Sequence, residues 1–241
     1  MDSSSHDNMS FLEHLEELRW HIIRSLIAIV SAGFICFLMK DFIFDTIIFG
    51  PKKMDFPTYK FLCQAATFIG VETTFCGDEF PFIVQNRTMA GQFSAHVMTS
   101  IISGFIISFP YILYEFWKFI SPGLLEKEKA KSRGFIFVSS MLFFIGVLFG
   151  YYIISPLSIN FLGTYQVSSQ VLNEIDLGSF ISLVRSSAIA SGIIFELPII
   201  IYFLTKAGVV TPESLVKYRK YALVLVLVLA AIITPPDVAS Q

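Results

Sequence analysis

Long runs almost without charge are the feature that most restricts what this chain can fold into. Residues 25–39 carry no charged side chain, residues 88–114 carry none over 27 positions, and residues 134–173 carry none over 40. Residues 177–205 are apolar apart from Arg185 and Glu196. A helix that spans a bilayer needs about 20 apolar residues, and the 40-residue run has room for one such helix and a loop. These four runs predict membrane-spanning helices.

A fifth run, residues 221–233, is dense in Leu, Val and Ala but short for a span. We expect it to span, because Arg219 and Lys220 can extend to the lipid headgroups and the bilayer can thin locally. Charged residues make up only 15% of the chain, against about 25% in soluble domains. The predicted fold class is therefore an all-α polytopic membrane helix bundle with five spans. It forms a single domain over residues 1–241, with a disordered stretch at residues 1–9.

The distribution of lysine and arginine predicts the orientation, because cytoplasmic connections are enriched in both. Residues 115–133 contain five of them and residues 206–220 contain four, whereas residues 156–178 and 234–241 contain none. The N-terminus and the two basic connections are thus expected in the cytoplasm. Residues 41–87 then form an enlarged outer loop, whose four basic residues count for little in so long a connection.

Two of the three cysteines, Cys63 and Cys76, lie in this outer loop, and Cys36 lies in the first span. An outer compartment permits disulfides. Either Cys63 and Cys76 form a disulfide or both are free thiols, and the sequence leaves the two alternatives open. The chain shows no metal-binding cluster, phosphate-binding loop or nucleophile motif, so no cofactor or metal is expected, and neither is nucleic acid.

The stretch before the first span, residues 10–24, mixes acidic and basic side chains at a predicted membrane surface. Ser10 and Glu13 fit a capping box, so a helix is expected to start near residue 11. Glu13 and Glu17 are four residues apart and share one helical face. This stretch is either an interfacial anchor with a solvated polar face or an acidic surface for a cationic partner.

Further candidates follow along the chain. Residues 121–123, Ser-Pro-Gly, are expected to end the second span, with Phe116, Trp117 and Phe119 forming an aromatic belt at the interface. Glu196 is an ionisable residue inside a span, which marks either a functional site or a structural contact with a neighbouring helix. The sequence TPPDV at residues 234–238 ends the fifth helix in a tight turn.

Four motifs, in this order and interleaved with these spans, resemble the TatC family of twin-arginine protein translocases. They are FLEHLEELR at residues 11–19, FISPGL at 119–124 with a glutamate further on, FELP at 195–198, and TPPDV at 234–238. The resemblance covers essentially residues 10–241. It implies a non-enzymatic receptor in a bacterial inner membrane that binds twin-arginine signal peptides of folded proteins at its cytoplasmic face. It also implies recruitment of single-span TatA/TatB-type subunits, contact with lipid, and transport driven by the proton-motive force. Self-association is left open.

The resemblance also implies roles for residues. Glu17 and Glu128 would receive the arginine pair, with Glu126 as a rival for Glu128. A guanidinium pairs with a carboxylate through two parallel hydrogen bonds, which lysine does not match. Further residues fall on characteristic positions of the family: Arg19, Phe119 and Pro122 at the signal-peptide site, Glu196 and Pro198 at the site for a partner subunit or a water-filled cavity, and Pro51 and Asp237 as structural residues of the outer side.

The resemblance implies a sixth span after Gln241, the last residue of this sequence, and the sequence leaves open whether that span is deleted. Two alternatives are retained. A proton-coupled secondary transporter of a small solute would use Glu196 as a proton relay, but no internal repeat is visible. An intramembrane enzyme would rely on His96 and Glu196, and neither lies in a catalytic motif. Both alternatives predict that the cytoplasmic glutamates are dispensable.

Overall fold

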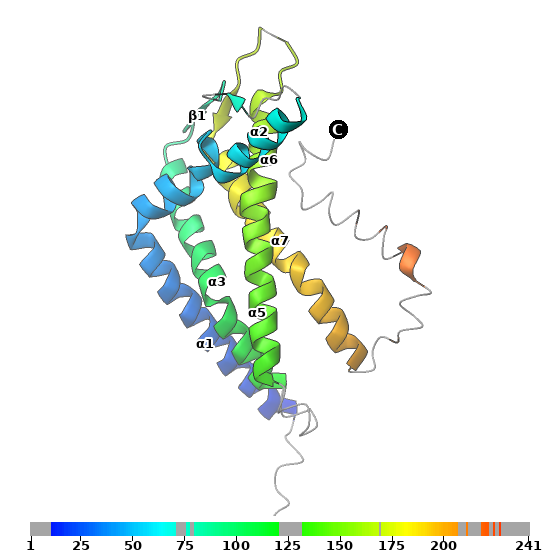
Figure 1. Cartoon of the computed structure of the whole chain (residues 1–241). Coiled ribbons are helices and arrows are strands. Elements are labelled where there is room, and N and C mark those ends of the chain that lie inside the picture. Colours follow the sequence, from blue (N-terminus) through cyan, green and yellow to red (C-terminus); the bar gives the residue numbers. More distant parts are fainter. Residues whose placement is uncertain are drawn as a thin grey trace, which may run out of the picture. The chain divides into compact units, whose positions relative to one another are not determined.

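The computed structural model describes residues 11–70, 76–77, 80–120, 132–168 and 170–206, with residues 211, 218–221, 224 and 227 beyond them. Long helices dominate (Figure 1). The elements in chain order are α1 (Phe11–Leu38), the π-helix η1 (Phe42–Ile48), the 3-10 turn η2 (Gly50–Lys52), α2 (Pro57–Ile69), β1 (Ile83–Gln85), α3 (Gly91–Ile120), α5 (Ser132–Phe149), the π-helix η5 (Gly150–Ile154), α6 (Ser155–Thr164), β2 (Glu174–Asp176) and α7 (Leu177–Lys206).

Within the described residues, four helical segments are long and apolar enough to cross a bilayer. They are Leu15–Leu38, Gly91–Ile120, Gly134–Thr164 and Leu177–Thr205. The all-α membrane fold is thereby confirmed, and these helices cover four of the five expected spans, with residues 134–173 divided into a helix and a loop. The fifth expected span, residues 221–233, lies almost wholly outside the described residues, as do residues 1–9. Its insertion and the predicted orientation remain predictions.

Contacts divide the chain into two compact units. Unit 1 comprises Met1–Leu38 and Ser100–Ser140. In unit 1, α1 and α3 approach at small residues. A Cβ atom on Gly104 would lie 2.5 Å from the backbone nitrogen of Gly33 and 2.6 Å from the carbonyl oxygen of Ile29. Ser108 donates a hydrogen bond to the carbonyl of Ala28 at 2.9 Å. Small residues let membrane helices pack backbone against backbone, so unit 1 is a close-packed helix pair.

Unit 2 comprises Met39–Thr99 and Met141–Gln241. In unit 2, η5 and α7 also approach each other at a glycine. A Cβ atom on Gly150 of η5 would lie 2.2 Å from the carbonyl oxygen of Ser187 in α7. The aromatic ring of Phe56 stacks on that of Tyr152 at 5.4 Å and meets that of Tyr151 edge-on at 5.6 Å. These contacts tie the segment between η2 and α2 to η5.

Strands in the described part of the chain are limited to β1 and β2, which pair in parallel with Ile83 opposite Glu174 and Gln85 opposite Asp176. Arg87 forms an exposed ion pair with Glu174 at 3.4 Å, just beyond this short sheet. The described part of the predicted outer loop, residues 41–87, contains η1, η2, α2 and β1.

Candidate functional site

The candidate site in unit 1 begins with three polar side chains on one face of α1. Glu17, His21 and Arg24 are spaced i, i+4 and i+7, so they follow one another along the helix. Helix α1 therefore presents an acid, an imidazole and a guanidinium in a row near its N-terminal end.

His21 is joined to Glu115 of α3, 94 positions later in the chain. The Nδ1 atom of His21 lies 2.5 Å from Oε2 of Glu115, and the two residues are only 5% and 3% exposed. Because a carboxylate only accepts hydrogen bonds, Nδ1 must carry the proton that it donates. An acid this deeply buried requires such partners, since desolvation opposes its charge.

Two further groups contact the same carboxylate. The Nη1 atom of Arg24 lies 3.8 Å from Oε2 of Glu115, within ion-pair range. The hydroxyl of Tyr111, one helical turn before Glu115 on α3, hydrogen bonds to it. Glu115 is thus the centre of a small network that draws on both helices of unit 1.

Glu17 lies next to this network and is partly exposed to solvent. Its Oε1 lies 3.9 Å from Nε2 of His21, which is too far for a hydrogen bond but within ion-pair range when the ring is doubly protonated. The Glu17 side chain is 35% exposed, whereas that of Glu115 is 4% exposed. Glu17 is therefore partly open to solvent, whereas Glu115 is shielded from it.

Among the residues predicted for signal-peptide binding, the structure brings Glu17 and Phe119 together around His21. The Phe119 ring meets the His21 ring edge-on at 6.1 Å. Arg19 is exposed on α1. Pro122 and Glu128, with its rival Glu126, lie outside the described residues. The expected aromatic belt is wrong for Trp117, which is buried and packs on Phe135 at 4.7 Å, whereas Phe116 is exposed.

Sequence reasoning missed His21 and Glu115. His21 lies in the mixed-charge stretch at residues 10–24 and Glu115 is the first residue of the predicted cytoplasmic connection, and neither belongs to one of the four motifs. The structure places Glu115 inside α3 and buries it. One signal was available, because an acid directly after a 27-residue uncharged run lies at a depth where an unpaired charge is costly. Its partner is 94 positions away, and helical spacing does not reveal it.

The predicted outer loop, which lies in unit 2, is stabilised by a buried tyrosine and by a disulfide. The Tyr59 hydroxyl lies 2.8 Å from the carbonyl oxygen of Pro51 and 2.9 Å from that of Pro156, and it donates to them. Burial raises the pKa of Tyr59 above its ordinary value. A disulfide joins Cys63 in α2 to Cys76, and the third cysteine, Cys36, is free and buried in α1.

Glu196 lies within α7 and is 7% exposed, two residues before Pro198. The helix runs without a break through Pro198. A buried acid in a membrane-spanning segment fits either a structural contact or a site for a partner, as the sequence suggested. Asp237, the last predicted residue of the outer side, lies outside the described residues.

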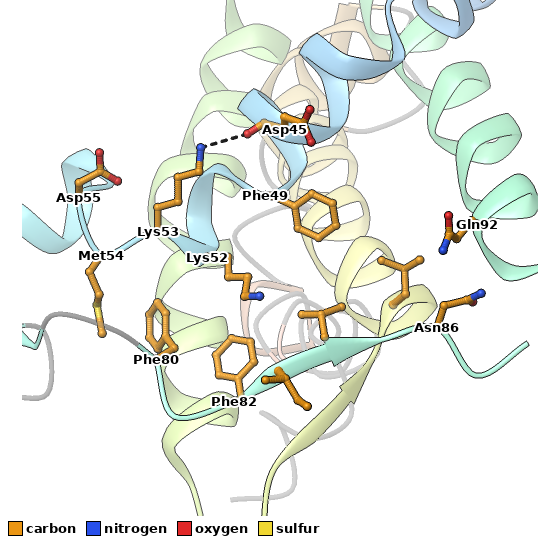
Figure 2. A pocket seen from close by; sticks show the side chains of 13 residues that line it. Asp45, Phe49, Lys52, Lys53, Met54, Asp55, Phe80, Phe82, Asn86 and Gln92 are labelled. Carbon is orange, nitrogen blue, oxygen red and sulfur yellow. Dashed lines mark hydrogen bonds between the residues drawn. The ribbon is translucent and has the colours of Figure 1, made fainter.

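Unit 2 also contains an open hollow of about 1110 Å³ beneath η1 and beside β1. Figure 2 shows Phe49, Phe80 and Phe82 around it and the Lys53 amine turned to the backbone carbonyl of Asp45, with which it forms a 3.3 Å hydrogen bond. The lining is mixed in charge, because it contains both aspartates and lysines. Among the described residues, no group of three His, Cys, Asp or Glu side chains is placed to hold a metal ion.

Comparisons with known proteins agree along the whole chain. The family model of TatC, the Sec-independent protein translocase protein, matches residues 13–241. A TatC from Blattabacterium sp. subsp. Periplaneta americana is 46% identical over 235 residues, covering 97% of this chain and 88% of that protein. A TatC from Aquifex aeolicus is 36% identical over 236 residues, covering 97% and 87%.

A solved structure shows the same fold. The crystal structure of the twin-arginine translocase receptor TatC in the detergent DDM superposes with a TM-score of 0.72 at 34% sequence identity, and the match covers 92% of this chain and 89% of that one. The predicted resemblance is thereby confirmed along with the helical membrane fold. The family match extends over nearly the whole sequence, and the chain belongs to the TatC family of Sec-independent protein translocases.

Proposed function

We propose that this chain is the receptor subunit of a twin-arginine translocase in a bacterial inner membrane. It binds the twin-arginine signal peptides of folded proteins at its cytoplasmic face, recruits single-span TatA/TatB-type subunits, and works without catalysing a reaction of its own. The observation that carries the proposal is the partly exposed carboxylate of Glu17 on α1, next to a buried network that leaves it accessible.

In this proposal Glu17 and Glu128 each receive one arginine of the ligand. A guanidinium presents two parallel N–H donors that match both oxygens of a carboxylate, whereas an ammonium offers a single point charge. Phe119, beside His21, adds an apolar surface for the residues next to the arginine pair. Family membership favours this function over the solute transporter, since the TatC relatives are described as translocase proteins.

The test is binding of a fluorescent signal peptide to the purified protein in detergent. The peptide with its arginine pair should bind at least tenfold more tightly than the same peptide with two lysines. Glu17→Gln and Glu128→Gln should each weaken binding of the arginine peptide, because a partly desolvated charge pair contributes about 1 kcal/mol or more. Glu174→Gln removes an exposed carboxylate from unit 2 and serves as the control. Equal binding of the two peptides would contradict the proposal.

A further inference from the structure

The α1 face that carries Glu17 also carries two basic side chains, His21 and Arg24. His21 is one helical turn from Glu17, and its Nε2 already lies 3.9 Å from Oε1 of Glu17. Arg24 is one further turn along, with a long, half-exposed side chain. Without a carboxylate from another helix, the nearest carboxylate to His21 and Arg24 along their own helix would be Glu17. A carboxylate neutralised from within the protein is a poorer receptor for an arginine ligand.

Glu115, on the neighbouring helix α3, offers His21 and Arg24 a second carboxylate. Its Oε2 is 2.5 Å from Nδ1 of His21 and 3.8 Å from Nη1 of Arg24. The distances from His21 and from Arg24 to Glu115 are both shorter than the 3.9 Å between His21 and Glu17. The described titratable or charged groups around His21 are Glu17 and Arg24 from α1 and Glu115 and Tyr111 from α3.

Glu115 and Glu17 differ in how far their side chains are exposed to solvent. Glu115 is buried beneath His21 and is unavailable to a ligand, whereas about a third of the Glu17 side chain is open to solvent. We propose that Glu115 is a positioning residue for signal-peptide binding: it holds His21 and Arg24 on its own carboxylate, so that Glu17 stays open to a ligand guanidinium. The inference rests on the proposed function, because Glu17 is taken as a receptor for arginine.

The decisive variant is Glu115→Gln. The amide oxygen still accepts the hydrogen bond from Nδ1 of His21, so the buried contact is retained, but the charge that held both cations is lost. His21 is then free to pair with Glu17. We expect the arginine peptide to bind about three- to tenfold more weakly to this variant than to wild type.

A double variant separates this role from a structural one. Glu115→Gln with His21→Gln removes the competing imidazole and leaves an amide pair in its place, so binding should recover to within about twofold of wild type. His21→Gln alone should bind at least as tightly as wild type, since Glu17 loses a competitor. This single variant keeps the test decisive if Glu115→Gln folds poorly. Glu174→Gln again controls for loss of a carboxylate.

Each outcome has a defined meaning. A wild-type protein that does not distinguish the arginine peptide from the lysine peptide overturns the proposed function, and this inference with it. A wild-type preference that Glu115→Gln leaves unchanged overturns the inference alone. So does a binding defect that His21→Gln fails to relieve, or a loss of binding in the His21→Gln single variant. Weaker binding by Glu115→Gln that is relieved in the double variant supports the inference.

Discussion

Tyr59 is a single residue that joins parts of unit 2 far apart in the chain, since it bonds to Pro51 and to Pro156, 97 positions later. Replacing it with phenylalanine leaves two buried carbonyls without this donor. We expect Tyr59→Phe to lower the free energy of unfolding by about 1–3 kcal/mol. Thermal unfolding of the protein in detergent would measure this. Tyr165→Phe, at an exposed position, is the matched control and should change little.

Tyr59 also makes the stability of the protein depend on pH in the alkaline range. Burial raises the pKa of Tyr59, so the folded protein holds the phenolic proton at a pH where an unfolded tyrosine, with a pKa of about 10, has released it. The contribution to stability is complete below about pH 10 and is lost as the pH rises above that value. Unfolding curves between about pH 8 and 11 should therefore fall more steeply for wild type than for Tyr59→Phe. Parallel curves would contradict this.

Glu196 tests a different property of a single residue, namely whether its charge is needed inside the membrane. We propose that the buried carboxyl works in its neutral form toward a partner subunit or enclosed water, as acids in apolar surroundings tend to. Glu196→Gln should then retain most signal-dependent export in cells lacking their own TatC, whereas Glu196→Ala should lose it. Comparable expression of both variants is the control. Equal damage by Gln and Ala would show that the charged form is required.

Between elements, the close approach of α1 and α3 depends on Gly104. A Cβ there would meet backbone atoms of Gly33 and Ile29, which cannot move aside as a side-chain end can. Gly104→Ala should therefore destabilise unit 1 by about 1–3 kcal/mol, the usual cost of overpacking. Gly134→Ala in α5 is a matched control, because a Cβ there has no neighbouring atom within 4 Å. A Gly104→Ala melting temperature equal to that of Gly134→Ala would contradict the assignment.

Elements were predicted from the sequence where one physical constraint decides their position. The cost of charge in a bilayer defines the four apolar segments, and the structure places helices over all of them. The outer loop is different, because α2 and the Cys63–Cys76 disulfide depend on contacts that a local pattern does not contain. The π-helix η5 was also not predicted. It lies beside α7 at Gly150, where the packing of a distant helix determines the local backbone.

The candidate site shows the same limit. Glu17 and Phe119 were found through motifs, because each lies in a recognisable short sequence. The buried pair of His21 and Glu115 was not, since both residues satisfy each other across two helices and neither stands in a motif. A buried polar pair is specified by the tertiary arrangement, and the sequence alone records only two polar residues at the edges of apolar runs.

For the whole molecule, the open prediction is its orientation. Lysine and arginine predict a cytoplasmic N-terminus and an outward-facing connection at residues 156–178. Single cysteines at two exposed positions test this. Val167→Cys, in that connection, should react with a membrane-impermeant maleimide in intact spheroplasts. Glu16→Cys, exposed on α1, should react only after the membrane is opened.

The parent chain is a suitable background for this labelling. Cys63 and Cys76 are joined in a disulfide and Cys36 is buried, so the chain should label weakly by itself. The predicted pattern would place Glu17, His21 and Glu115 on the side from which cytoplasmic signal peptides arrive, because Glu16 and Glu17 are neighbours on α1. Labelling of Glu16→Cys in intact spheroplasts, with Val167→Cys protected, would reverse the orientation. The Glu17 network would then face away from the cytoplasm, and its role as a receptor would have to be abandoned.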